Sequence, residues 1–147
     1  MQQTQHPELE GWQPFIGTWE TEASHPQLPG DPIHGDSTIE WLDGRRFVIQ
    51  RSHYDHPQIP DAIAIIGVVD GELSMHYFDS RGVFRVYAVS LEGATWRFWR
   101  DGPDFAQRFT CTLSDDGDTI EGQGELSWDG STWEGDLAIT YRRLGSA

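Results

Sequence analysis

Hydrophobic and polar residues alternate along most of this chain, in short segments that glycine-containing turns separate. The alternation is clear in residues 105–113, where one set of alternate positions contains Phe105, Phe109, Cys111 and Leu113. A period of two is typical of a β-strand with one buried face. No segment shows the period of a long amphipathic helix. The pattern therefore predicts an all-β fold.

About ten strands are predicted, each next to its neighbour in the chain. Residues 25–35 hold three prolines and two glycines and are predicted to form a loop. Residues 1–14 are polar apart from Leu9 and Trp12, and they predict a short helical turn that covers one end of the fold. Many short strands in succession favour one closed up-and-down antiparallel β-barrel, with residues 1–147 as a single domain. The predicted strands are about 18–24, 36–42, 45–54, 62–69, 72–80, 83–91, 95–101, 105–113, 119–128 and 132–143.

The turns between the strands predict which side chains face the inside of the barrel. Where a turn holds two residues, the residues that flank it pair with each other, and the pairing continues outward. This register starts from residues 105–113 and places Arg85 directly opposite Arg100. A single bulge would exchange the two faces of residues 73–100. The inner face predicted in this way consists of Ser74, His76, Phe78, Arg85, Tyr87, Val89, Trp96, Phe98, Arg100 and Gln107.

These inner-face residues, together with Phe109, form a candidate ligand-binding site. Two arginines opposite each other repel unless an anion lies near them. That anion is either an acidic group of a ligand or one of the nearby carboxylates Asp79, Asp101 and Asp104. Gln107 also needs a partner, because a buried amide must form hydrogen bonds. The predicted site comprises His76, Phe78, Arg85, Tyr87, Trp96, Phe98, Arg100, Gln107 and Phe109.

Composition excludes several classes of function. The formal net charge is −14, which argues against a nucleic-acid partner. All ten basic residues are arginine, so a Schiff-base or phosphate-loop lysine is excluded. Cys111 is the single cysteine and cannot form an internal disulfide. The chain shows no secretory signal and no apolar run long enough for a membrane helix, so we expect a cytoplasmic protein with no membrane partner.

Motifs for metal binding or catalysis are not visible. The histidines at 25, 34, 53 and 56 do not have the spacing of a standard metal site, so no metal is predicted. No nucleophile elbow, phosphate loop or pair of catalytic carboxylates is found, and no catalytic residue is assigned. The cofactor, if there is one, stays unassigned at this point.

Gly17-Thr18-Trp19, at the start of the first predicted strand, resembles the Gly-x-Trp motif of the calycin barrels. In the lipocalins this tryptophan packs across the barrel end against an arginine of a late strand, which implies Arg142 or Arg143 here. The strand number resembles the fatty-acid-binding proteins and the haem-binding nitrobindins. Nitrobindins carry an axial histidine on the last strand, but residues 133–137 contain none, so haem binding of that kind is not expected. Segments similar to uncharacterised bacterial lipocalin-like proteins are HYFDSRGVFRVY, WRFWRD, QRFTCTLSDDGDTI and WEGDLAITYRR.

Three hypotheses about function remain open. The first is binding of a small hydrophobic or aromatic ligand with an acidic group inside a barrel cavity. The second is a lyase or isomerase that acts on such a ligand, with His76 and Tyr87 as an acid–base pair. The third is a filled barrel whose exposed aromatic residues form a homodimer. Binding without catalysis is preferred, because no residue pattern requires chemistry.

Overall fold

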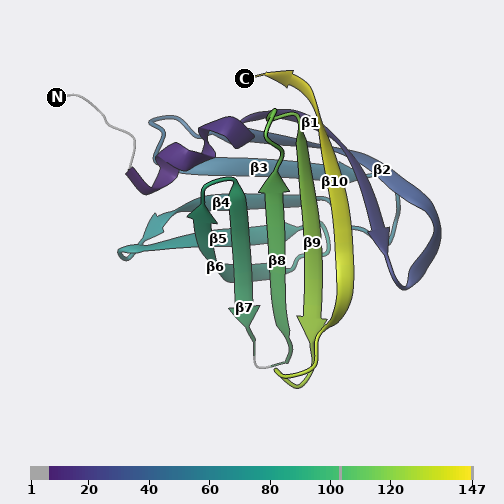
Figure 1. Cartoon of the computed structure of the whole chain (residues 1–147). Helices are drawn as coiled ribbons and strands as arrows, with labels where there is room; N and C mark the ends of the chain where they lie inside the picture. The colour runs from purple at the N-terminus through teal and green to yellow at the C-terminus, as the bar shows by residue number, and fades with distance from the viewer. Residues whose placement is uncertain (1–6, 103, 147) are drawn as a thin grey trace.

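Ten antiparallel strands close into a barrel in the computed structural model, which describes residues 7–102 and 104–146 (Figure 1). Each strand pairs with the next one in the chain, and the first pairs with the last. The prediction of an all-β up-and-down barrel is confirmed. The elements are η1 (Pro7–Phe15), β1 (Gly17–His25), β2 (Leu28–Trp41), β3 (Phe47–Tyr54), β4 (Ala62–Val69), β5 (Glu72–Asp79), β6 (Phe84–Glu92), β7 (Thr95–Asp101), β8 (Ala106–Leu113), β9 (Thr119–Ser127) and β10 (Glu134–Ser146).

The turn between β4 and β5 shows how local sequence sets the register. Val69 pairs with Glu72, and the two residues between them have positive φ angles, 53° at Asp70 and 82° at Gly71. This conformation matches the right-handed twist of the flanking strands, and Asp-Gly adopts it readily. The predicted hairpin is confirmed at this position.

One end of the barrel is closed by the 3-10 helix η1. Its side chains Leu9, Trp12 and Phe15 are fully buried. The rings of Trp12 and Phe15 meet the ring of Trp96 edge to face, at centroid distances of 6.0 and 5.9 Å. The predicted helical turn, with Leu9 and Trp12 as its apolar contacts, is confirmed within the described residues.

Trp19 and Arg143 pack against each other at the same end of the barrel. The guanidinium carbon of Arg143 lies 4.2 Å from the centroid of the buried Trp19 ring. Arg143 also donates to the backbone oxygens of Pro14, Ile16 and Gly117. Arg142 instead points outward and pairs with Glu22. Of the two arginines implied by the Gly-x-Trp resemblance, Arg143 is therefore the partner of Trp19.

The predicted loop at residues 25–35 is wrong. Only Pro26 and Gln27 form the turn, and β2 begins at Leu28. The ladder with β1 is irregular between Ala23 and His25, so Pro29 and Pro32 fall where the strand has no partner on β1. A proline cannot donate to a ladder, and it is tolerated where no such donation is needed.

The loop between β5 and β6 overturns the predicted register of β5. Asp79 pairs with Val83 through its backbone N–H, which leaves three residues in the loop instead of two. Gly82 has a φ of 85°, the left-handed conformation that ends such three-residue loops. One additional residue exchanges the two faces of β5, because side chains alternate along a strand. Met75 and Tyr77 therefore face inward, opposite Tyr87 and Arg85.

Other register differences leave the predicted faces unchanged. The turns predict that Phe98 pairs with Tyr87 and Gln107. It pairs instead with Val89 on one side and Phe109 on the other, which is two positions away in each case. A shift of two positions keeps every side chain on its own face. Consequently β6, β7 and β8 present the predicted inner residues.

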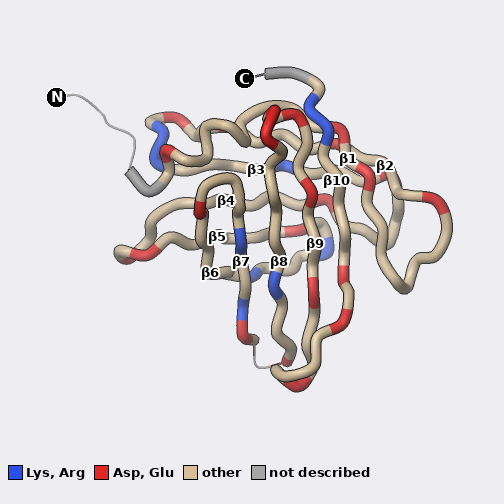
Figure 2. The backbone as a smooth tube through the Cα atoms, viewed as in Figure 1, with Lys and Arg blue, Asp and Glu red and all other residues tan. Residues whose placement is uncertain are grey.

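Charges of both signs are spread over the barrel. Asp and Glu positions occur on most strands and turns, and arginines occur on β3, β6, β7, β8 and β10 and in the turns before β3 and β6 (Figure 2). No helix in the described part of the chain is long and apolar enough to cross a membrane.

Candidate functional site

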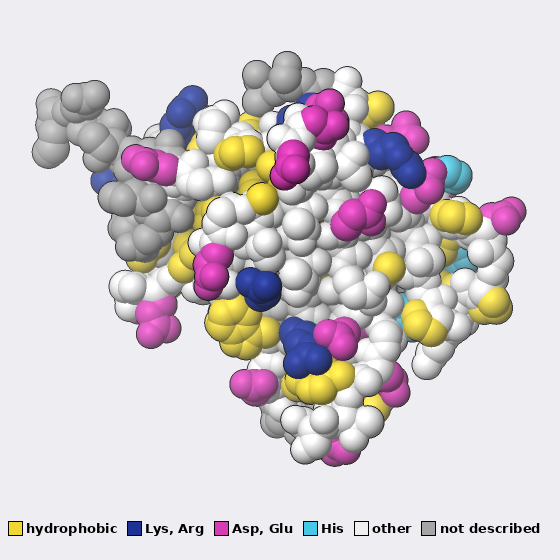
Figure 3. Space-filling model, viewed as in Figure 1, with side chains coloured by type: hydrophobic (Ala, Val, Ile, Leu, Met, Phe, Trp, Pro, Cys, Tyr) yellow, Lys and Arg dark blue, Asp and Glu magenta, His cyan; other side chains and the backbone are white. Residues whose placement is uncertain are grey.

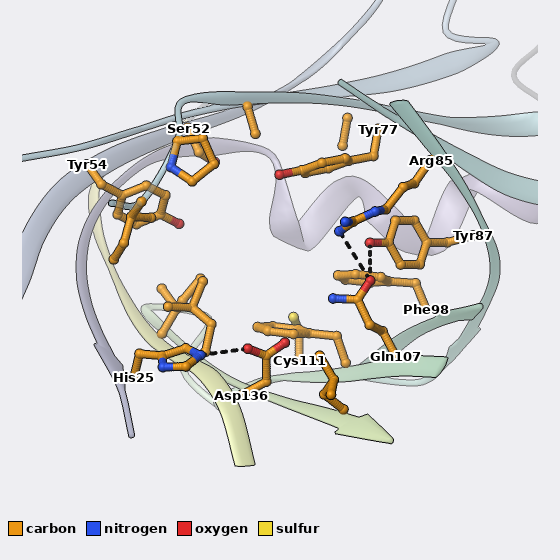
Figure 4. Close-up of a pocket in the computed structure, with 18 of the residues that line it drawn as sticks. His25, Ser52, Tyr54, Tyr77, Arg85, Tyr87, Phe98, Gln107, Cys111 and Asp136 are labelled. Atoms are coloured by element: carbon orange, nitrogen blue, oxygen red, sulfur yellow. Dashed lines mark hydrogen bonds and ion pairs between the residues drawn. The ribbon is translucent and has the colours of Figure 1, made fainter. Parts of the chain in front are cut away.

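A cavity of about 510 Å³ lies inside the barrel (Figure 4). Strands β3 to β8 and β10 form most of its wall, and β1, β2 and β9 each add a residue. Gln58, Ile59 and Pro60, from the loop between β3 and β4, also line it. A cavity of this volume is in the range that holds a small organic ligand.

Six of the nine predicted site residues line this cavity. They come from the three consecutive strands β6, β7 and β8, whose inner faces the register places correctly. These residues are Arg85, Tyr87, Trp96, Phe98, Gln107 and Phe109. Whether they contact a ligand stays a prediction.

His76, Phe78 and Arg100 do not line the cavity. His76 pairs with Val86, and Phe78 pairs with Phe84, on the outer face that the longer loop gives to β5. The inward placement of these two residues is therefore wrong. His76 and Tyr87 lie on opposite faces of the sheet and cannot act as an acid–base pair. On the β6 side Ala88 pairs with Trp99, which puts Tyr87 and not Arg85 opposite Arg100, so the predicted pairing of Arg85 with Arg100 is also wrong.

The outer face of β4 to β7 carries a row of exposed hydrophobic side chains, which includes Phe78. Figure 3 shows hydrophobic side chains on the surface over β7. These side chains are between 38% and 55% exposed, and dimerisation through them stays a prediction. The set consists of Ile63, Phe78, Phe84, Val86 and Trp99.

A polar cluster of three predicted residues projects into the cavity from β6 and β8. The Tyr87 hydroxyl donates to Gln107 Oε1 at 3.0 Å, and Arg85 Nη1 donates to the same oxygen at 3.4 Å. Because arginine can only donate, the amide oxygen of Gln107 must face it. The Gln107 Nε2 group is left without an acceptor among the described residues, and Figure 4 shows it on the cavity side.

The carboxylates near these arginines are already engaged. Asp104 pairs with Arg100 at 3.2 Å, so the rim-carboxylate alternative is correct for that arginine. Asp79 binds Arg81 at 2.6 Å and also accepts from the Tyr77 hydroxyl at 2.8 Å. No carboxylate of the described residues forms an ion pair with Arg85. Arg85 is thus a half-buried cation in the cavity with no neutralising partner there.

Aromatic rings form the apolar floor next to the cluster. Phe98 and Phe109 are stacked at 5.2 Å with an interplanar angle of 15°. The ring of Tyr87 meets Phe98 edge to face at 5.2 Å. Gly122 and Gly124 lie behind Phe109, and a Cβ at either position would lie 2.8 Å from the Phe109 ring. Their missing side chains make room for Phe109, not for a ligand.

Burial raises the pKa of several hydroxyl and thiol groups in the cavity. Burial raises the pKa of Tyr87, although the guanidinium of Arg85 opposes the shift. Burial also raises the pKa of Tyr54 and that of the Cys111 thiol, each to about 12. These groups stay protonated near neutral pH, so Tyr87 serves as a hydrogen-bond donor and Cys111 is a poor nucleophile.

A second polar group in the cavity was not predicted from the sequence. His25 Nε2 and Asp136 Oδ1 lie 2.9 Å apart, and both residues line the cavity. Asp136 faces inward because of a bulge: β10 places Asp136 and Leu137 between Gly135 and Ala138, where β9 has Gly124 alone. Bulges re-aim side chains in this way. Alternation along the strand predicts an outward Asp136 and an inward Gly135, and both placements are wrong.

His53 and His56 lie apart from this pair and have their own partners. His53 contacts Asp61 at 2.8 Å and Asp55 at 3.1 Å, at the two ends of the loop that contributes to the cavity. His56 Nδ1 accepts from the backbone of Gln58. Within residues 7–102 and 104–146, no three His, Cys, Asp or Glu side chains come together as metal ligands would.

Comparisons with known proteins agree on the architecture. No family model and no curated protein sequence matches the chain. The crystal structure of Rv2717c from M. tuberculosis is similar, with a TM-score of 0.65, 15% sequence identity and coverage of 97% of this chain and 100% of that one. The S-type phycobiliprotein lyase CPES from Guillardia theta has a TM-score of 0.56 and 9% identity, with 94% and 93% covered. The shared feature is the β-barrel fold.

Proposed function

We propose that the barrel binds a small aromatic or hydrophobic molecule with an acidic group, and that Arg85 receives the acid. The observation that carries the proposal is the half-buried Arg85 guanidinium, which has no carboxylate partner among the described residues. A cation in a largely apolar cavity costs free energy unless an anion compensates it. A ligand carboxylate would supply that anion.

Gln107 and Tyr87 also favour an anionic ligand group at this position. The Gln107 amide oxygen already accepts two hydrogen bonds, so the amide can offer only its two N–H groups to a ligand. With Arg85, these donors form a surface that suits a carboxylate, which accepts several hydrogen bonds. Phe98 and Phe109 would contact the apolar body of the ligand next to it.

A pair of nearly isosteric probes tests the proposal. The probes are 4′-methylbiphenyl-4-carboxylate and the corresponding neutral carboxamide, titrated into the protein by calorimetry. We expect the carboxylate to bind better to the wild type, and Arg85→Met to weaken it by roughly tenfold to a hundredfold, because hydrogen bonds to charged groups contribute about 1.5–3 kcal/mol. The affinity for the carboxamide should fall much less in this variant.

Arg97→Met is the matched control, since Arg97 is exposed on β7 and its loss changes the net charge equally. It should leave the affinity for the carboxylate unchanged. Equal losses for both probes in Arg85→Met would refute the role of Arg85 as the anion partner. A carboxylate affinity that falls equally in both variants would show a general charge effect instead of a site.

The similarity to the phycobiliprotein lyase CPES suggests a second function, but lyase activity is a property of that protein. The cavity supports no specific reaction, because His76 lies outside it and Cys111 stays protonated. Binding is therefore the function that the geometry supports best.

A further inference from the structure

The charge on Asp136 faces the cavity without a cation to balance it. Its side chain is 23% exposed, and its partner among the described residues is His25. The bulge in β10 turns this carboxylate inward, into a wall that also contains Leu137 and Ile139. A half-buried carboxylate has about four acceptor sites, and in such surroundings it needs further donors or a cation besides His25.

His25 is neutral in the observed geometry. The backbone N–H of Gln27 donates to His25 Nδ1 at 3.0 Å, so this nitrogen carries no proton. A neutral imidazole has one N–H group, which must then be at Nε2 and donate to Asp136 Oδ1 at 2.9 Å. His25 therefore orients Asp136 but does not neutralise it. Because both ring nitrogens are engaged, His25 is also not free to act as a base.

Among the polar groups that line the cavity, two have opposite character and lie on different strands. Arg85 and Gln107 offer donors from β6 and β8, and Asp136 offers an acceptor from β10. They do not form an ion pair with each other. Figure 4 shows apolar and aromatic side chains between the two groups.

We propose that the ligand has a positively charged nitrogen that binds Asp136, in addition to the acid that binds Arg85. This inference rests on the proposed function. It narrows the ligand class from aromatic acids to aromatic molecules with an acid at one end and an amine at the other. Asp136 is the residue that would discriminate between these two classes.

The test uses three biphenyl probes and variants of the full chain. The probes are 4′-(aminomethyl)biphenyl-4-carboxylate, 4′-methylbiphenyl-4-carboxylate, which lacks the amine, and 4′-(aminomethyl)biphenyl-4-carboxamide, which lacks the acid. Asp136→Asn removes the charge at nearly constant shape. Glu20→Gln is the control, because Glu20 is exposed on β1 and its loss changes the net charge equally. Dissociation constants are measured by calorimetry.

We expect the amine to increase the affinity of the wild type at least about tenfold, and we expect the same gain in Glu20→Gln. In Asp136→Asn the gain should vanish. The comparison of the two acids in the wild type needs no variant, so it holds even if Asp136→Asn folds poorly. Equal affinity of the two acids for the wild type would overturn the inference, as would an amine gain that survives in Asp136→Asn.

The outcomes separate this inference from the proposed function. If the acids bind equally and still depend on Arg85, the Asp136 inference fails and the proposed function stands. If the amine-containing carboxamide binds through Asp136 while Arg85→Met has no effect on the acids, the proposed function fails. Absence of binding for all three probes up to millimolar concentration would refute both.

Discussion

Arg143→Met is predicted to destabilise the barrel strongly, because Arg143 joins three segments at its closed end. Its guanidinium donates to the backbone oxygens of Pro14 at 2.6 Å, Ile16 at 2.8 Å and Gly117 at 2.9 Å. It also lies over the fully buried ring of Trp19. Hydrogen bonds to charged groups contribute about 1.5–3 kcal/mol each, and a desolvated cation–π contact about 2 kcal/mol.

These contributions are not additive, because water can reach part of the end and hydrate the freed carbonyl groups. We therefore expect the free energy of unfolding to fall by about 3–5 kcal/mol in Arg143→Met. Urea unfolding followed by tryptophan fluorescence measures this loss as a lower midpoint at unchanged slope. Arg143→Lys should recover little of it, because an ammonium group cannot reproduce the forked contacts.

Arg142→Met is the control on the adjacent residue. Arg142 is exposed and pairs with Glu22 at 3.1 Å, and such surface pairs contribute about 0–1 kcal/mol. If Arg143→Met costs no more than Arg142→Met, the assignment of Arg143 as the closing residue is refuted.

Three further predictions concern the wall and the loops. Gly124→Ala should lower the free energy of unfolding by about 1–3 kcal/mol, since its Cβ would lie 2.9 Å from the Leu137 carbonyl oxygen. In the control Gly135→Ala the new Cβ makes only an ordinary contact. Equal urea midpoints for the two variants would contradict this prediction. Burial acts to raise the pKa of Asp79, but hydrogen bonds from Arg81 and other donors lower it to about 2. The wild type should therefore have a higher free energy of unfolding than Asp79→Asn above about pH 4, and this difference should be lost as the pH falls through about 2. A difference that is constant with pH would argue against this network. The contact with Asp61 raises the pKa of His53. The melting temperature of the wild type should therefore exceed that of His53→Gln by more at about pH 5.5 than at about pH 9. The opposite trend would exclude the predicted linkage.

The alternation of residues in strands was sufficient to predict the barrel and the cavity wall formed by β6, β7 and β8. The inward Phe109 and Cys111 fixed β8, and register errors of two positions left β6 and β7 on their correct faces. Asp70-Gly71 formed the hairpin that its residues favour. The six correctly placed cavity residues all come from this part of the chain.

What could not be predicted depends on single inserted residues. One additional loop residue beside Gly82 moved His76 and Phe78 to the outer face. One bulge in β10 turned Asp136 into the cavity. Neither feature changes composition or periodicity enough to be detected in one sequence. A two-residue loop and a three-residue loop at this point would both contain the same Arg81-Gly82 pair. The sequence signal for Asp136 is a carboxylate beside Gly135, directly before the alternating apolar residues Leu137, Ile139 and Tyr141.

If Arg85 receives the acid of a ligand inside the barrel, a crystal structure with 4′-methylbiphenyl-4-carboxylate will show that contact. We predict that the carboxylate lies within hydrogen-bond distance of Arg85 and Gln107 Nε2, with its rings against Phe98 and Phe109. A carboxylate that points out of the cavity, or a probe bound outside the barrel, would contradict the account.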